Sequence, residues 1–352
     1  MKIGLDATYS LGDNLSGVGV YSNEILSRIP VAHPEAQYVL CYRPHRFLRS
    51  LKRPLPPGQK RALLWKDWPH SVDLFHALNQ RIDSTRFRRA VSTFHDLFVM
   101  TGDYSTQEFR SRFTLQARLA AQRSDLIIAV SQFTADQVHE LLRVERSRIR
   151  VVHHGCDAQV VGAASAREPV ILFVGAIQKR KNVSALVKAF EQTRPDWKLV
   201  LAGSAGYGAE EIRAEVERSP RRGDIEMPGY VSREALESLY SRAAIFAFPS
   251  LDEGFGIPVL EALARGIPVL TSDGSALREV AGDAAMLVDP RDVDAIAAGL
   301  IRLTDDEELR KQLAKKGRIR SAGFTWEKAV ESTWSVYREL LPSFKTPNAS
   351  GT

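Results

Sequence analysis

Short apolar runs alternate with longer helical patterns in two series along this chain of 352 residues. An apolar run without polar alternation is typical of a parallel strand that is buried on both faces, and helices supply the crossovers that parallel strands need. We expect strands at residues 2–7, 38–42, 74–78, 90–94, 126–131 and 149–154, and then at 169–175, 197–203, 243–249, 267–272 and 284–289. The pattern therefore predicts an α/β protein with two doubly wound, Rossmann-like domains.

A small, polar stretch at residues 158–169 separates the two series and is typical of a linker. We expect an N-terminal domain at 1–160 and a second domain at 166–325. The remaining residues, 326–352, hold a helical pattern that we expect to pack back on the N-terminal domain, followed by a flexible tail. Two such domains facing each other would form a cleft at the carboxyl ends of their strands, where α/β sheets bind ligands.

The composition limits the location and the partners of the protein. The N-terminus lacks a signal-peptide core and no run is apolar enough to span a membrane, so we expect a cytoplasmic protein with free thiols at Cys41 and Cys156. Residues 1–165 contain 22 Lys and Arg against 15 Asp and Glu, whereas the remainder contains 26 against 27. The basic first half suggests an anionic partner there, namely a phosphate-bearing acceptor, a membrane surface or nucleic acid.

An acidic, glycine-rich corner follows the expected strand at 243–249. It contains Glu253, Gly254 and Gly256 before a helical pattern that carries Pro258 and Glu261. Glycines let the backbone approach a ligand closely, and the N–H groups at the start of a helix favour an anion such as a diphosphate. Carboxylates accept hydrogen bonds from sugar or ribose hydroxyls. Strand termination and solvated glutamates would explain each residue taken alone.

The whole stretch, EGFGIPVLE, resembles the E-x7-E motif of retaining glycosyltransferases of the two-domain GT-B fold, above all glycosyltransferase family 4. The resemblance implies that Glu253 contacts the hydroxyls of the transferred sugar and that Glu261 holds the ribose of its nucleotide. The donor-binding residues of this corner are then Gly254, Phe255, Gly256, Ile257 and Glu261. ALARGIPVLTSD behind it also matches the family pattern.

The segment FVGAIQKRKNV places Gly175 at the end of a strand and Arg180 and Lys181 at the entry to a helix. Adjacent cations there can neutralise a diphosphate leaving group, although a basic surface turn has the same composition. The segment resembles the family element in which Arg and Lys bind the donor phosphates. Some family members carry Arg directly after the Gly, whereas this chain has Ala176, so the role falls more heavily on Arg180 and Lys181.

Two elements of the first half resemble the family as well. The loop SGVGV, with Gly17 and Gly19, is not a G-x-G-x-x-G fingerprint and gives no support for a nicotinamide cofactor. It is similar to the family loop that covers the donor phosphates. The element HDL puts His95 directly after a strand, and the resemblance implies that His95 positions the donor sugar rather than acting as a general base.

Residues 109–123 form an amphipathic stretch with arginines at 110, 112, 118 and 123. A solvated helix face explains this pattern. The alternative is a peripheral contact with an anionic membrane, at the inner membrane face, with Phe109 and Phe113 as anchors.

The sequence is thus identified as that of a mannosyltransferase-like, retaining family 4 enzyme. We expect it to move a hexose from a GDP or UDP sugar to a saccharide or lipid-linked acceptor, as in cell-surface polysaccharide synthesis. The resemblance implies that the leaving phosphate oxygen assists the incoming hydroxyl, and we expect neither a cofactor nor a metal. Two alternatives are a sugar-nucleotide epimerase of the same architecture and a basic nucleic-acid-binding protein, although the arginines match no recognised nucleic-acid module.

Overall fold

The computed structural model describes residues 1–12, 17–65, 71–83, 87–157 and 167–341. Most of the predicted linker, Ser16 of the predicted glycine loop and the predicted tail therefore lie outside the described residues. The chain divides into two compact units. Unit 1 comprises Met1–Met100, Gln107–Gly155 and the chain from Trp326 onward, whereas unit 2 comprises Thr101–Thr106 and Cys156–Thr325.

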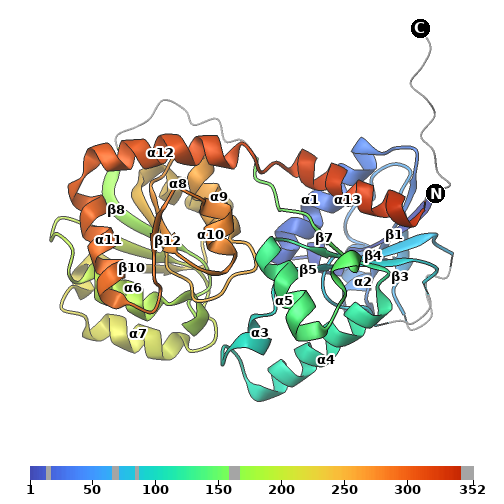
Figure 1. Cartoon of the computed structure of the whole chain (residues 1–352), viewed down its shortest axis with the longest axis horizontal. Coiled ribbons are helices and arrows are strands. Elements are labelled where there is room, and N and C mark those ends of the chain that lie inside the picture. The colour runs from blue at the N-terminus through green and yellow to red at the C-terminus, as the bar shows by residue number, and fades with distance from the viewer. Residues whose placement is uncertain (13–16, 66–70, 84–86, 158–166, 342–352) are drawn as a thin grey trace, which may run out of the picture. The chain divides into compact units, whose positions relative to one another are not determined.

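Unit 1 is built on a seven-stranded parallel sheet with the order β3-β2-β1-β4-β5-β6-β7 (Figure 1). The strands are β1 (Lys2–Asp6), β2 (Gln37–Tyr42), β3 (Lys60–Leu63), β4 (Leu74–Ala77), β5 (Ala90–Phe94), β6 (Leu126–Ala129) and β7 (Ile149–Val151). The sequence pattern did not predict β3, because this edge strand reads KRAL and contains no apolar run. The order reverses between β1 and β4, since β2 lies on one side of β1 and β4 on the other.

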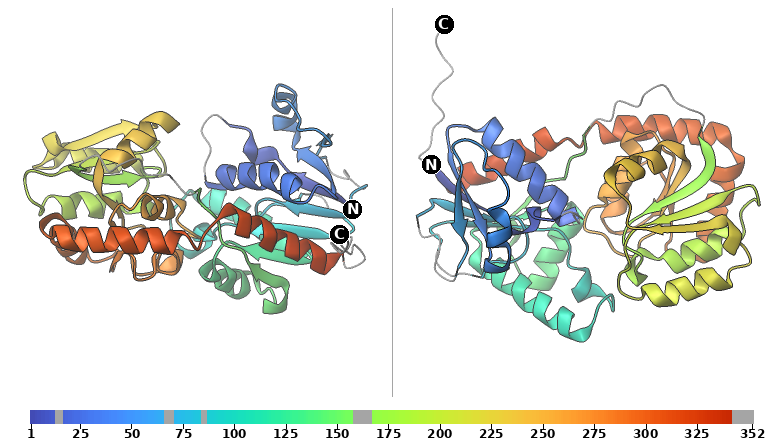
Figure 2. Two further views of the ribbon diagram at one scale, coloured as in Figure 1. Left: turned by 90° about the horizontal axis from the view of Figure 1, so that it is seen from above. Right: turned by 180° about the vertical axis from the view of Figure 1, so that it is seen from behind.

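Helices cover both faces of this sheet, as the two views of Figure 2 show. They are α1 (Gly17–Ala32), α2 (Pro44–Ser50), α4 (Gln107–Arg123), α5 (Gln132–Leu142) and α13 (Trp326–Leu340), and a short α3 (Phe98–Thr101) precedes α4. Alternate residues of one strand enter different cores: Leu126 and Ile128 pack on the side of α1 and α13, whereas Ile127 packs on the side of α4 and α5. Both faces of the sheet are therefore buried, as the continuous apolar runs require.

The last helix of the chain completes the first of these cores. Trp326, Trp334 and Tyr337 of α13 are at most 5% exposed and pack among residues of β1, β4 and α1. The ring of Trp334 also stacks on His33 at 4.0 Å.

Unit 2 contains a six-stranded parallel sheet with the order β10-β9-β8-β11-β12-β13. Its strands are β8 (Glu168–Val174), β9 (Lys198–Ala202), β10 (Ile225–Gly229), β11 (Ala243–Phe248), β12 (Val269–Ser272) and β13 (Met286–Val288). The sequence pattern missed β10, an edge strand whose Pro228 interrupts the apolar residues. Here the strand order reverses between β8 and β11.

The helices of unit 2 are α6 (Val183–Phe190), α7 (Ala209–Arg218), α8 (Arg233–Arg242), α9 (Ile257–Ala264), α10 (Ser275–Ala281), α11 (Val293–Asp305) and α12 (Glu307–Ser321). In Figure 1, α9 and α12 lie on one side of the sheet, and α6 and α7 on the other. Helix α6 packs against α7 and α11, while α9 packs against α10 and α12.

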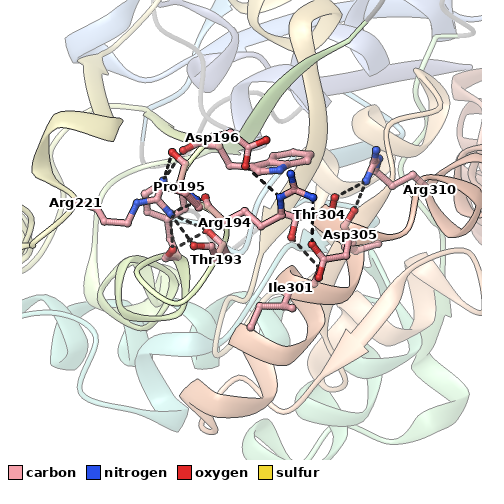
Figure 3. Close-up of polar contacts among 12 residues, drawn as sticks. Thr193, Arg194, Pro195, Asp196, Arg221, Ile301, Thr304, Asp305 and Arg310 are labelled. Atoms are coloured by element: carbon pink, nitrogen blue, oxygen red, sulfur yellow. Dashed lines mark hydrogen bonds and ion pairs between the residues drawn. The ribbon is translucent and has the colours of Figure 1, made fainter.

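The turn between α6 and β9 is held by a single arginine (Figure 3). The guanidinium of Arg221 lies 4.1 Å from the ring of Phe190. It donates hydrogen bonds to backbone carbonyls at Phe190, Thr193, Arg194, Pro195 and Trp197. A planar donor group thereby satisfies carbonyls that the turn leaves outside the helix and the strand.

Two Rossmann-like parallel sheets agree with the predicted fold class.

Candidate functional site

A buried carboxylate and two cations meet at the carboxyl ends of β8 and β11, where the strand order of unit 2 reverses. One carboxylate oxygen of Glu253, Oε1, lies 2.5 Å from Nζ of Lys181, and the other, Oε2, lies 3.1 Å from Nη1 of Arg180. The three residues are between 7% and 9% exposed. Reversal points of open α/β sheets are where such folds bind their ligands, so the geometry marks this cluster as a candidate site.

The two cations of this cluster determine the protonation state of its carboxylate. Burial opposes the charge of Glu253, but Arg180 and Lys181 outweigh burial and lower the pKa of the carboxyl group to about 2. Ser250 strengthens the effect because its hydroxyl donates a hydrogen bond of 2.6 Å to Oε1. Glu253 is therefore ionised at neutral pH and is an acceptor of hydrogen bonds rather than a general acid.

Backbone contacts fix the two loops that carry these charges. Arg180 and Lys181 lie on the short 3₁₀ turn η3 (Lys179–Lys181) after β8. The carbonyl of Arg180 accepts a bond of 2.8 Å from the amide of Leu251, and its guanidinium donates to the carbonyl of Asp252. Nζ of Lys181 lies 4.7 Å from the centre of the Phe248 ring. Segments about 70 residues apart in the sequence are thus joined side by side.

Asn182 links the same two loops and starts α6. It adopts the left-handed conformation, with φ of 58°. Its side-chain amide donates hydrogen bonds to the carbonyls of Pro249, at 3.1 Å, and Pro290, at 2.6 Å. The consecutive residues Arg180, Lys181 and Asn182 therefore combine two site cations with a structural asparagine.

Gly256 marks the start of α9, and the protein needs glycine there for two reasons. Its φ of +102° is unfavourable for residues with a side chain, and an added Cβ would lie 2.6 Å from Cδ2 of Leu277. Pro258 occupies the second position of α9, because the helix begins at Ile257. Phe255 is 4% exposed, and its ring lies 6.0 Å from that of Phe324.

Glu261 lies in the second turn of α9, and its carboxylate already has one protein partner. The hydroxyl of Tyr240 donates a hydrogen bond of 2.9 Å to Oε2. Burial raises the pKa of Glu261, while Arg265 and the bond from Tyr240 act against this effect. The sequence contained no signal for Tyr240, because its partner lies 21 residues away on another helix.

Gly175 ends β8 with φ of +156°. Its carbonyl oxygen is approached so closely by the end of β9 that a Cβ on Gly203 would lie 1.8 Å from it. The close approach of the two strand ends thus requires glycine at position 203.

His95 lies in unit 1, directly after β5, and its ring is enclosed. Nε2 donates a hydrogen bond of 2.9 Å to the carbonyl of Leu78, since a carbonyl can only accept. Burial lowers the pKa of His95 to about 4, against the opposing effect of that carbonyl. The ring packs edge-on to Tyr21 at 4.9 Å and on His154 at 5.4 Å. At neutral pH the imidazole is neutral with Nδ1 as its acceptor, which suits a positioning residue.

A series of buried, hydrogen-bonded side chains lies behind His95, and the sequence did not predict it. Nε2 of His76 lies 2.8 Å from Oγ1 of Thr93, which in turn lies 2.9 Å from the hydroxyl of Tyr21. Nδ1 of His76 lies 2.6 Å from the hydroxyl of Tyr337 on α13. Burial lowers the pKa of His76 to about 3. This series of side chains connects α1, the middle of the sheet and the last helix.

The remaining predicted residues of unit 1 have mixed outcomes. Helix α1 begins at Gly17, which is exposed, and Gly19 in its first turn is buried. Phe109 is 37% exposed, but Phe113 packs against the core between the sheet and α4. Phe113 is thus partly buried by packing, and a membrane contact of this helix stays a prediction. Of the helices in the described ranges, none has the length and apolar character to cross a membrane, and Cys41 and Cys156 are free thiols.

Two family models match the chain in succession. Residues 18–160 match the model described as Glycosyltransferase Family 4, and residues 157–320 match the model described as Glycosyl transferases group 1.

Among curated proteins, the chain is 30% identical over 383 aligned positions to O-antigen chain mannosyltransferase B of Escherichia coli. The alignment covers 97% of this chain and 100% of that protein. The serotype-specific mannosyltransferase WbdA of Escherichia coli is 27% identical to this chain in an alignment that covers 65% of this chain and 30% of WbdA.

Among solved structures, sucrose-phosphate synthase from Thermosynechococcus elongatus superposes with a TM-score of 0.77 at 21% identity, over 98% of this chain and 100% of that one. Anabaena Alr3699/HepE in complex with UDP and glucose gives a TM-score of 0.75 at 16% identity, over 96% and 100%. These structures share the GT-B fold with this chain. Together with the full-length relative and the two family models, they show that the chain belongs to glycosyltransferase family 4, a family of retaining GT-B enzymes that transfer a hexose from a nucleotide sugar.

Proposed function

We propose that the enzyme transfers mannose from a nucleoside diphosphate mannose to a saccharide or lipid-linked saccharide in the synthesis of a cell-surface polysaccharide. The full-length relative named as an O-antigen chain mannosyltransferase supports the sugar and the pathway class. A GDP sugar is the preferred donor, and a UDP sugar is the second candidate because a structural relative was solved with UDP-glucose.

The observation that carries this proposal is the buried cluster of Glu253, Arg180 and Lys181. In the proposed role, the two cations bind the donor diphosphate and stabilise the charge that grows on it as the glycosidic bond breaks. Glu253 is held ionised and accepts hydrogen bonds from hydroxyls of the transferred sugar. Glu261 accepts from the ribose, and Tyr240 fixes the orientation of its carboxylate.

The start of α9 and the glycine loops complete the proposed donor site. The backbone of Gly254, Phe255, Gly256 and Ile257 borders the diphosphate, and the amino end of α9 adds a favourable dipole. Gly175 borders it from the loop after β8, and Gly17 and Gly19, in the first turn of α1, are proposed to bind the phosphates as well.

For the chemical step, the acceptor hydroxyl attacks the anomeric carbon on the face that the leaving diphosphate occupies. Its proton passes to the departing phosphate oxygen, the glycosidic bond to that oxygen breaks, and configuration is retained. His95 positions the sugar through an acceptor atom, because its Nε2–H is used by Leu78. This scheme needs no metal and no carboxylate nucleophile, and positioning and charge stabilisation supply the catalysis.

We also infer that the donor binds in unit 2 and the acceptor in the basic unit 1. The free thiols fit a reducing compartment, so we place the enzyme in the cytoplasm, with a peripheral contact at the inner membrane face.

A panel of GDP, UDP and ADP sugars tests the donor. We expect GDP-mannose to raise the melting temperature most, because a ligand that binds only the folded state stabilises it. Release of nucleoside diphosphate should require an added acceptor. Interconversion of the sugar without an acceptor would instead identify an epimerase, and stabilisation by no nucleotide sugar would contradict the proposal.

A further inference from the structure

A pocket of about 390 Å³ lies in unit 1, within the roughly 300–1,000 Å³ that is usual for small-molecule sites. It is formed by the end of α1, the first residues of β1 to β3 and the turn before β3, and its wall includes Lys2, Pro34, Tyr38, Val39, Gln59 and Lys60. These three strands are parallel neighbours, so the pocket lies at their amino ends. It is therefore at the opposite edge of the sheet from His95 and is not part of the proposed transfer site.

The walls of this pocket are held in place by the chain itself. The amide of Gln59 donates to the carbonyl three residues earlier at 3.3 Å, which closes a tight turn. Pro57 and Gly58 occupy its two central positions, and φ of +77° at Gly58 is typical of a type II turn. Tyr38 is 3% exposed, and its hydroxyl donates to the carbonyl of His33 at 2.8 Å. The pocket is thus largely formed before a ligand binds.

One polar atom in this wall lacks a partner. Oε1 of Gln59 is shielded from solvent and accepts no hydrogen bond within the described ranges. A buried acceptor without a partner costs free energy, and a ligand hydroxyl that donates to it removes that cost. The amide of Gln59 therefore points to a ligand that carries a hydroxyl group.

The pocket is also positively charged. Lys2 and Lys60 line it, and no carboxylate does so in the wall that the structure describes. Nζ of Lys2 donates to Oγ of Ser71 at 3.0 Å, which uses one of its three N–H groups. Lys60 is exposed and pairs with no carboxylate of the described residues. Oε1 of Glu35 lies 3.5 Å from Nδ1 of His33 instead. Two ammonium groups without a counter-charge favour a phosphate.

From these features we propose that the pocket is a second ligand site, which binds a small phosphate monoester with free hydroxyl groups, namely a sugar phosphate. The phosphate accepts hydrogen bonds from Lys2 and Lys60, a hydroxyl donates to Oε1 of Gln59, and the apolar face of the sugar packs on Val39 and Pro34. The inference goes beyond the proposed function and does not depend on it. Because the ligand would join α1, the turn before β3 and the first strands, it would stabilise unit 1.

The test uses the full-length protein and mannose 6-phosphate as the probe, measured by titration calorimetry. We expect binding to be about tenfold weaker in Lys60→Ala, which loses a charged donor, and in Gln59→Glu, which keeps the shape and adds a negative charge. Lys52→Ala is the matched control, because Lys52 is an exposed lysine of unit 1 that does not line the pocket. Since Lys60 is exposed, Lys60→Ala keeps the test valid if Gln59→Glu does not fold.

Two further measurements separate this site from the donor site. The affinity for mannose 6-phosphate should be unchanged in Lys181→Ala and in the presence of saturating GDP-mannose. Displacement by GDP-mannose would assign the phosphate to the donor site and overturn the proposal, while the donor function would stand. If the parent does not bind mannose 6-phosphate, or binds it no better than Lys60→Ala, the second site is wrong. Inorganic phosphate that binds as tightly as mannose 6-phosphate would overturn the assignment of a sugar phosphate.

Discussion

Lys181 Nζ and Glu253 Oε1 lie 2.5 Å apart at two loops that are 72 residues apart in the sequence, and both residues are less than 10% exposed. A buried ion pair of this kind contributes little net stability, because desolvation offsets much of the attraction. Removing one partner is costly, since the other charge then stays buried alone. The proposed site is therefore sensitive to substitutions that keep the shape of the side chain and change only its charge.

Replacing Glu253 with Gln tests its role in binding the sugar. We expect transfer to fall by about 100-fold or more, because a neutral amide is a weaker acceptor for the hydroxyls. The free energy of unfolding should fall by about 3 kcal/mol, because Arg180 and Lys181 lose their counter-charge. Steady-state kinetics and chemical denaturation measure the two effects. Full activity in a folded Glu253→Gln protein would show that the sugar-hydroxyl role is wrong.

Lys181→Ala tests the binding of the diphosphate. A hydrogen bond to a charged group contributes about 1.5–3 kcal/mol, so calorimetry should show donor affinity reduced by about 10- to 100-fold. Lys179→Ala is the control, because Lys179 lies two residues before Lys181, its side chain is 44% exposed, and it pairs with Glu211 rather than with Glu253. Equal donor affinity in Lys181→Ala and the parent would contradict the phosphate assignment.

Gly256→Ala tests whether the start of α9 depends on a glycine conformation. A left-handed backbone and a Cβ placed 2.6 Å from Leu277 should together lower the free energy of unfolding by about 2–4 kcal/mol. Gly274→Ala serves as the comparison, because Gly274 is extended and an added Cβ meets nothing within 4 Å. Denaturant titration of both variants checks the difference, and equal stabilities would refute the packing argument.

The buried histidines of unit 1 predict sensitivity to acid. The folded pKa values of His76, at about 3, and His95, at about 4, lie below the ordinary value of 6.5, and that of His154 is also lowered by burial. The unfolded chain therefore binds more protons, and stability is lost as pH falls from about 6.5 toward these values. At pH 5, His76 and His95 should each cost about 2 kcal/mol relative to pH 7.5.

Calorimetry between pH 7.5 and pH 5 measures this loss. In His76→Gln the decrease in melting temperature should be smaller, because one titrating group is gone. A parent protein whose melting temperature is the same at both pH values would contradict the prediction.

The sequence was sufficient to predict both parallel sheets, because central strands buried on two faces have continuous apolar runs. It was insufficient for β3 and β10, since edge strands do not need such runs and one contains Pro228. For the candidate site, the motifs predicted that Glu253, Arg180 and Lys181 bind the same ligand. Their direct contact and the bond from Tyr240 to Glu261 depend on tertiary packing, which no local pattern records.

The position of α13 has a consequence for the order in which the chain matures. Trp326, Trp334, Tyr337 and three further residues of α13 fill a core whose remaining members come from the first 152 residues. All of unit 2 except Thr101–Thr106 is encoded between these two parts of the chain. During synthesis, unit 2 can fold while unit 1 still exposes the apolar surface that α13 will cover. A ribosome that stops before codon 326 would therefore release a protein with a finished unit 2 and an aggregation-prone unit 1, although less than a tenth of the chain is missing.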